Sequence, residues 1–193
     1  DACRDAAAQA GIPPSDDFNR GDNFGCGYFE VNQKRGVRWN ASKAFLRPVL
    51  HRPNLKVVTH AQVTGLVRRT DGSGRIEGVE YRIDGASGES KRTLCDSEVV
   101  LSAGAIGSPQ ILQCAGIGAG ARLREAGVTP VTELPGVGAN LQDHLQLRMI
   151  YKVRNVRTLN QQANSLIGKA GIGLEYLLFR SGPMSMSPSQ LGA

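Results

Sequence analysis

The sequence has few of the residues that build metal centres and disulfide frameworks. Among its 193 residues, four are cysteines that lie far apart with no Cys-x-x-Cys pair, so neither a zinc site nor a redox dithiol is predicted. The three histidines, His51, His60 and His144, form no His-x-x-x-His pattern. We therefore predict no metal site, and the unpaired cysteines favour a reducing compartment.

Aromatic residues and long apolar runs are also scarce. Aromatics make up 5% of the chain, too few for the stacking platform that single-stranded nucleic acid needs. Lys and Arg exceed Asp and Glu by 23 to 17, but the charges are scattered and indicate a solvated basic surface. No apolar run approaches the roughly 20 residues of a membrane-spanning helix. We expect no nucleic-acid partner, no membrane span and a cytoplasmic protein, with peripheral attachment to the inner face of a membrane as the alternative.

The residues that are present predict a globular chain with short helices. Hydrophobic residues make up 40% and charged residues 21%, which are globular values. Helices are predicted over residues 1–10, 40–52, 109–115, 121–126 and 171–182. Glycines 11, 116 and 127 follow three of them as stop signals, and Ser108 followed by Pro109 suits a helix start.

Strands are predicted by alternation and by apolar runs. Residues 54–70 indicate two strands or one bent strand, and residues 79–83 alternate as a hairpin partner. The segment 91–101 returns as a strand whose last residues, 99–101, are fully apolar and are expected to be buried on both faces. Residues 145–153 alternate as a further strand.

A run of small residues follows the apolar segment. Ser102, Ala103, Gly104 and Ala105 leave the main chain bare at the carboxyl end of the predicted strand. Nucleotides bind at this end of a strand in open α/β sheets, and the following helix N-terminus adds partial positive charge for phosphates. Close packing of helix on strand is the alternative explanation for the small residues.

The segment Gly104–Gly118, "GAIGSPQILQCAGIG", closely resembles the second signature of the glucose-methanol-choline (GMC) family of FAD-dependent oxidoreductases. That signature has Gly-Ala-x-x-Ser-Pro, two aliphatic residues and Ser-Gly-aliphatic-Gly, and Ala115 stands where the family usually has serine. The stretches "DDFN", "GVRWNASKAFLRP", "RPNLKVVTHAQVTGL", "EGVEY" and "LPGVGANLQDHL" are similar to the choline-dehydrogenase and alcohol-dehydrogenase branch. The resemblance covers nearly the whole chain in the family's order.

The resemblance implies FAD as the cofactor and four residues close to it. Val63 is expected beside the adenine end, bonding it through backbone groups, with an ordinary core valine as the alternative. Ser102, Ala103 and Gly104 are expected to approach the adenosine and pyrophosphate region. The family's catalytic histidine lies in a C-terminal motif that this sequence does not contain, so we predict no catalytic residue and take His144 as structural or near the cofactor.

The resemblance also implies the architecture. We expect an α/β to α+β fold that is part of a GMC-type FAD-binding domain, with a mixed sheet and a β-hairpin or meander, plus pieces of a substrate-binding domain. Residues 1–53 are expected to link to the substrate domain, residues 54–144 to form part of the FAD-binding domain, and residues 145–193 to begin the substrate-binding domain. The Gly-x-Gly-x-x-Gly that seats the FAD pyrophosphate does not occur, so we expect a middle portion of a longer enzyme.

The implied activity is flavin-dependent oxidation of a primary alcohol, with hydride transfer to FAD and then to an electron acceptor. We expect this portion alone to be inactive and to retain no FAD, because much of the flavin site and the proton-transfer groups lie outside it. A free-standing nucleotide-binding or interaction module without redox activity is the alternative. The residues leave open which alcohol is used and whether the enzyme is an oxidase or a dehydrogenase.

Overall fold

The computed structural model divides into two compact units, unit 1 (Asp1–Leu55 and Ile150–Ala193) and unit 2 (Lys56–Met149). The structure describes residues 2–85, 87–147, 150–187 and 189–193. Helices and small sheets are mixed in both units, so the predicted α/β to α+β class is confirmed. The domain boundaries expected from the sequence stay a prediction, because the two units are defined by compactness and not by ligand binding.

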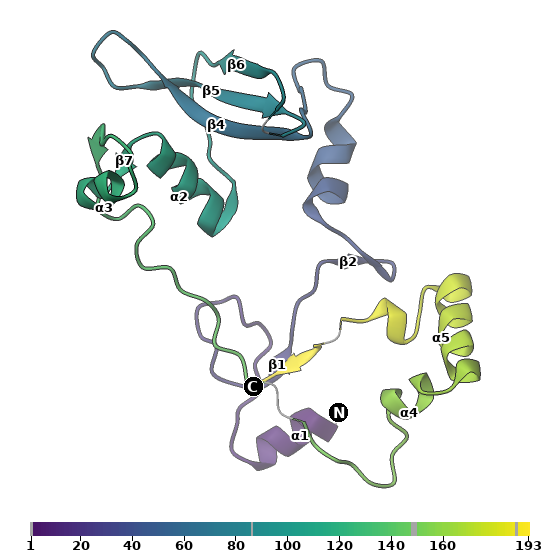
Figure 1. Ribbon diagram of the computed structural model, residues 1–193. Coiled ribbons are helices and arrows are strands. Elements are labelled where there is room, and N and C mark those ends of the chain that lie inside the picture. The colour runs from purple at the N-terminus through teal and green to yellow at the C-terminus, as the bar shows by residue number, and fades with distance from the viewer. Residues whose placement is uncertain (1, 86, 148–149, 188) are drawn as a thin grey trace. The chain divides into compact units, whose positions relative to one another are not determined.

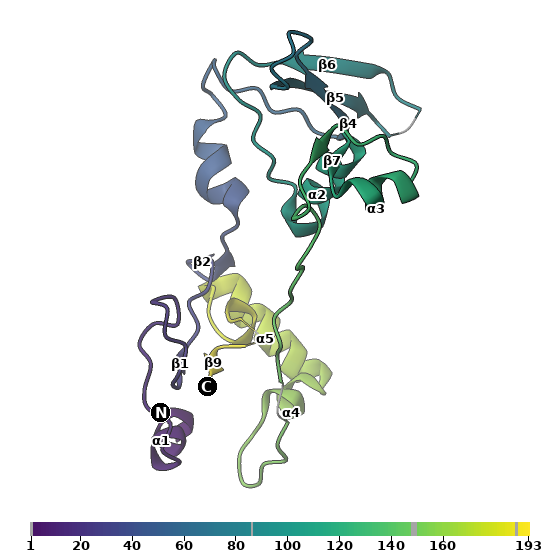
Figure 2. The ribbon, with the colours of Figure 1, turned by 90° about the vertical axis from the view of Figure 1, so that its left-hand side faces the viewer.

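Unit 1 consists of short helices and two-stranded sheets (Figures 1 and 2). Its elements are α1 (Ala2–Gln9), β1 (Gly27–Tyr28), β2 (Gln33–Lys34), β3 (Val37–Arg38), the π-helical turn η1 (Ser42–Leu46), the 3-10 turns η2 (Arg47–Val49) and η3 (Pro183–Ser185), α4 (Leu159–Ala163), α5 (Leu166–Phe179) and β9 (Leu191–Gly192). Strand β1 pairs antiparallel with β9, and β2 pairs antiparallel with β3. Segments from both ends of the sequence therefore meet in this unit.

Local signals explain where the elements of unit 1 begin and end. Helix α1 is followed by Gly11, whose φ of 84° only glycine adopts easily. Thr158 and Gln161 form a capping box at the start of α4. The predicted helix over 40–52 is replaced by η1 and η2, because Pro48 lacks the N–H that a regular α-helix would use. Asn40 still caps the segment, accepting a hydrogen bond from the Lys43 N–H at 3.0 Å.

Unit 2 combines a three-stranded meander with two helices. Its elements are β4 (Ala61–Arg68), β5 (Ile76–Ile83), β6 (Ser90–Leu94), α2 (Gly104–Cys114), β7 (Ile117–Gly118), α3 (Gly120–Glu125) and β8 (Thr132–Glu133). The meander is antiparallel in the order β4-β5-β6, and β7 pairs parallel with β8. Helix α2 packs against β4, beneath the sheet in Figures 1 and 2. The predicted hairpin of residues 79–83 is confirmed by the pairing of Val63 with Tyr81.

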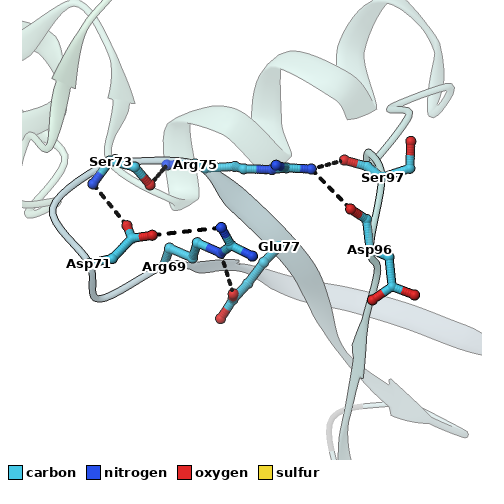
Figure 3. A network of polar contacts seen from close by, with 7 residues as sticks. All are labelled: Arg69, Asp71, Ser73, Arg75, Glu77, Asp96 and Ser97. Carbon is cyan, nitrogen blue, oxygen red and sulfur yellow. Dashed lines mark hydrogen bonds and ion pairs between the residues drawn. The ribbon is translucent and has the colours of Figure 1, made fainter.

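The turn between β4 and β5 is held by side chains (Figure 3). The Asp71 carboxylate accepts the Ser73 N–H at 2.9 Å and lies 3.7 Å from the Arg69 guanidinium. Hydrogen bonds from Ser73, together with the charge of Arg69, lower the pKa of Asp71 below its ordinary value of 3.8. Arg69 also bonds Glu77 at 3.2 Å, so the turn is tied to the start of β5.

One predicted strand is formed only in part, and another is not formed in the described residues. Of the predicted strand 91–101, residues 91–94 lie in β6. Residues 99–101 lie in an extended segment without strand pairing, and Val100 is 72% exposed, so the predicted burial on both faces is wrong. A strand buried on both faces belongs to a sheet that has packed layers on both faces, and in the described part of the chain this segment joins no sheet. Residues 145–147 and 150–153 are likewise not strand, and 148–149 lie outside the described residues.

Within residues 54–70 one strand forms, β4 over Ala61–Arg68, and it carries register shifts between Val63 and Gly65 and between Val67 and Arg68. This outcome matches the single bent strand among the two alternatives. Residues 55–58 precede β4 without strand pairing. Among the helices that the structure describes, none is long and apolar enough to cross a membrane.

Candidate cofactor-binding site

The approach to the candidate site is fixed by Arg75, the residue before β5. Its guanidinium donates hydrogen bonds to the Asp96 carbonyl at 3.1 Å and to the Ser97 carbonyl (Figure 3). Asp96 and Ser97 follow β6 and precede the extended segment that leads to the small residues. Arg75 therefore fixes the backbone at Asp96 and Ser97, between β6 and the segment that leads to the candidate site.

The three small residues predicted to meet the cofactor, Ser102, Ala103 and Gly104, are all exposed. Gly104 has a φ of 84°, and a Cβ added there would have no neighbour within 4 Å. The Ala103 N–H is already used, because it donates to the Ser108 hydroxyl at 3.0 Å. No side chain therefore covers the main chain at Gly104. A ligand that lies directly against backbone needs such an open surface.

Helix α2 starts earlier than the sequence predicts. Ser108 was expected to be its N-cap, but the helix begins at Gly104 and Ser108 and Pro109 lie inside it. The Ser108 hydroxyl instead reaches back one turn to the residue that precedes the helix. Because of the early start, the first-turn N–H groups, which have no intrahelical partner, begin within the run of small residues, at Gly104.

Val63, the fourth predicted residue, lies on β4 and is half-buried. Its carbonyl accepts a hydrogen bond from the side-chain amide of the adjacent Gln62 at 3.3 Å. Because α2 packs against β4, the structure brings the strand of Val63 and the helix that begins at Gly104 into contact. Strand β4 is also an edge strand of the meander, so one of its edges has no strand partner within the described residues.

A hollow of about 830 Å³ lies beside the first turns of α2. Its lining comes from α2, from Arg122 of α3 and from the connector of residues 136–142. The Gln113 side-chain amide donates to the Val137 carbonyl at 3.3 Å and thereby joins α2 to that connector. A Cβ on Gly138 would lie 2.6 Å from the same amide, a flexible group that can shift, and the φ of 73° at Gly138 is the feature that favours glycine there.

None of the four predicted residues lines this hollow, which begins at Ala105, the residue after Gly104. The connector of residues 136–142, which lines the hollow, was not predicted from the sequence to be part of the site. The signal was available, because its Gly-x-Gly spacing at residues 136–138 permits close backbone approach and because the resemblance extended over this stretch. Asn140, in the same connector, has a φ of 55°.

The chemistry of the hollow suits an anionic, partly apolar group. Among the described residues of its lining, Arg122 is the one charged side chain, and Ile106, Pro109 and Leu112 supply apolar surface. First-turn N–H groups of α2 add partial positive charge. Among the described residues the lining contains no histidine and no carboxylate, the side chains that most often transfer protons.

The other groups considered from the sequence lie apart from this chemistry. His144 is exposed, and its N–H donates to the carboxylate of the neighbouring Asp143 at 2.8 Å. Within the residues that the structure describes, no cluster of three metal-ligating side chains occurs. The four cysteines are free thiols, and Cys26 is buried.

Relatives of known sequence match nearly all of the chain. It is 37% identical over 188 residues to an alcohol dehydrogenase [acceptor] of Pseudomonas putida, an alignment that covers 97% of this chain and 33% of that protein. It is 41% identical over 174 residues to the mitochondrial choline dehydrogenase of Homo sapiens, covering 90% of this chain and 28% of that protein. The chain thus spans about a third of the length of the curated relatives it matches.

Solved structures and a family model agree with these relatives. A fungal aryl-alcohol oxidase superposes with a TM-score of 0.83 at 28% identity, covering 98% of this chain and 32% of that one. An FAD-dependent oxidoreductase from Chaetomium thermophilum, 24% identical, shares the fold with a TM-score of 0.82 over 97% of this chain and 33% of that one. The model of the GMC oxidoreductase family matches residues 1–146. The chain belongs to the GMC oxidoreductase family.

Proposed function

We propose that this chain is part of an FAD-dependent oxidoreductase that removes hydride from the CH–OH group of a primary alcohol. Family membership and the relatives named for alcohol and choline oxidation support the reaction class. Bound FAD would supply the hydride acceptor. An electron acceptor that reoxidises the flavin, and a small-molecule alcohol, are the partners that this proposal requires.

The observation that carries the proposal is the exposed main chain at Gly104. Ser102, Ala103 and Gly104 would let the adenosine and pyrophosphate part of FAD lie against backbone, with the N-terminus of α2 and Arg122 facing the phosphates. Backbone groups of Val63 on β4 would meet the adenine end. The open space at the Gly104 Cβ position and the single charge in the hollow fit such a group.

The division of labour follows from what lines the hollow. Since the lining holds no histidine and no carboxylate, we assign the residues of unit 2 to cofactor binding and not to removal of the hydroxyl proton. Residues 54–144 would be part of the FAD-binding domain, with residues 1–53 and 145–193 belonging to or leading into the substrate-binding domain. We further propose a cytoplasmic location with peripheral attachment to a membrane, which the basic composition supports.

One expression experiment tests the function. The complete coding sequence that contains this chain is expressed, and the product is examined for a flavin absorbance spectrum and for reduction of an artificial electron acceptor by a panel of alcohols. We expect a yellow protein with alcohol-dependent dye reduction, and a colourless, inactive 193-residue chain. A full-length protein without flavin would favour the alternative, a binding module without redox activity.

A further inference from the structure

Unit 1 carries the whole net positive charge of the chain. Lys and Arg outnumber Asp and Glu by 13 to 7 in unit 1, whereas unit 2 contains 10 of each. The excess is concentrated in residues 31–55, which contain no acidic residue. This stretch, here named the basic segment, contains Lys34, Arg35, Arg38, Lys43, Arg47 and Arg52. The net charge of +6 is therefore a local feature and not a uniform one.

The cations of the basic segment have no acidic partners. All are exposed except Lys43, which is half-buried, and none forms an ion pair within the described residues. The Nζ atoms of Lys34 and Lys43 lie 5.1 and 5.9 Å from the centroid of the same Trp39 ring. An aromatic ring attracts ammonium groups without neutralising them. The fold thus gathers positive charge here without an acidic partner among the described residues.

Apolar side chains lie among these cations. Phe45 is 76% exposed and Leu50 is 52% exposed, and both belong to the turns η1 and η2 or the residue directly after them. Arg47 stands between them in the sequence and Arg52 follows. Exposed apolar residues beside unpaired Lys and Arg are the combination that binds the surface of an anionic bilayer, through burial at the headgroup boundary and attraction to lipid phosphates.

We propose that the basic segment is a docking surface for anionic phospholipid headgroups, with Phe45 and Leu50 as its apolar contacts. The proposal deepens the peripheral attachment proposed above and rests on it. Cover by uncharged protein would bury unpaired cations, which is strongly unfavourable. Single-stranded nucleic acid would need free aromatic faces, and Trp39 already faces two lysines.

Vesicle sedimentation tests the proposal without flavin or activity. The full-length protein that contains this chain is mixed with phosphatidylcholine vesicles, with or without phosphatidylglycerol, at low and high salt. We expect partitioning onto the anionic vesicles to be at least about tenfold stronger and to fall as salt rises. A failure to bind vesicles would not contradict the proposed alcohol oxidation. Likewise, a full-length protein without flavin would not contradict the proposed vesicle binding.

Matched variants locate the surface. Arg47→Glu with Arg52→Glu should lower partitioning about tenfold or more, while Lys91→Glu with Arg124→Glu in unit 2 makes the same charge change and should alter it less than twofold. Phe45→Ser should lower partitioning several-fold, whereas Phe24→Ser, also exposed in unit 1 at 73%, should not. Circular dichroism checks folding, and Arg47→Gln with Arg52→Gln replaces the charge reversal if that variant unfolds.

Three results would overturn the proposal. The first is equal binding to vesicles with and without phosphatidylglycerol. The second is an equal effect of the charge reversals in the two units. The third is retention by an acidic protein but not by anionic vesicles, which would identify a protein surface as the partner of the basic segment.

Discussion

The two units of this chain differ in the balance between their basic and acidic residues. Unit 2 is balanced, and it pairs its charges locally, as Arg69 does with Glu77 and Arg92 with Glu80. Unit 1 has an excess of six positive charges, concentrated where no acidic residue occurs. The difference separates two kinds of function. In the functions proposed above, main chain and a weakly charged hollow of unit 2 would meet the cofactor, whereas side-chain charge of unit 1 would meet an external anion.

The units are similar in how little apolar surface they bury. The buried hydrophobic residues that the structure describes are Cys26 and Ile172 in unit 1 and Val67, Ile117 and Leu123 in unit 2. Several large residues of α5 are exposed, among them Ile167 at 87% and Phe179 at 73%. The stability of each unit therefore depends on a few buried side chains. A single substitution at one of them should destabilise the unit that contains it.

The largest effects are expected from a pair of core truncations. Leu123→Ala in α3 and Ile172→Ala in α5 each remove a buried side chain and should lower the free energy of unfolding by about 2–4 kcal/mol. Amide hydrogen exchange should show faster exchange in the mutated unit only. Equal loss of protection in both units after either substitution would mean that they unfold as one body, and the comparison would fail.

The next effect concerns flavin binding by unit 2. Gly104→Val places a side chain on the bare main chain and should lower the flavin content of the full-length protein at least about tenfold. Gly72→Val is the matched control, since both glycines have positive φ and open space around the Cβ position, so both substitutions cost about 1–2 kcal/mol in backbone strain. Equal flavin loss in the two variants would attribute the effect to strain alone.

A smaller effect is expected at the residue that holds the approach to the site. Arg75→Ala removes the hydrogen bonds to the carbonyls of Asp96 and Ser97 and should cost about 1 kcal/mol of stability. Exchange should become faster in the segment from Asp96 to Gly104. Arg92→Ala, which removes an exposed ion pair with Glu80, serves as control and should leave that segment unchanged.

The smallest effect is a pH dependence in the β4–β5 turn. Because the folded pKa of Asp71 is lowered, its ionised carboxylate stabilises the turn above the ordinary value of 3.8, and this contribution is lost as the pH falls through the folded pKa. Asp71→Asn should flatten the stability profile in that acidic range, and Ser73→Ala should flatten it partly. Urea unfolding measured across the acidic range checks both. Identical profiles for all three proteins would remove Asp71 as a contributor.

Local signals in the sequence predicted the elements that depend only on local chemistry. Gly11 and Gly127 end helices as expected, and the hairpin of β4 and β5 follows from alternation and a turn of Asp, Gly and Ser. The prediction for segment 99–101 is wrong because apolar composition indicates burial, while burial on both faces requires a sheet covered by packed layers, and this segment joins no sheet in the described chain. Apolar composition indicates that burial would be favourable for a segment. It does not show whether the fold places other elements against that segment.

The role of the predicted site residues stays a prediction, and the same reasoning explains which parts of the candidate site the sequence indicates. The small residues at 102–104 were recognisable because bare backbone has a direct signature in composition. The wall formed by residues 136–142 was not, since it depends on the Gln113 hydrogen bond to Val137 across the fold. The sequence predicts Ser108 as the N-cap, but its hydroxyl accepts a hydrogen bond from the Ala103 N–H. This partner depends on where the helix starts.

The most direct test of the account is hydrogen exchange of the full-length protein with and without FAD. If FAD lies against the main chain at Ser102–Gly104, peptides covering this stretch and the first turn of α2 should exchange more slowly when FAD is bound, while peptides of β6 should not change. Unchanged exchange over Ser102–Gly104, with protection gained elsewhere, would contradict the assignment of this segment to the cofactor.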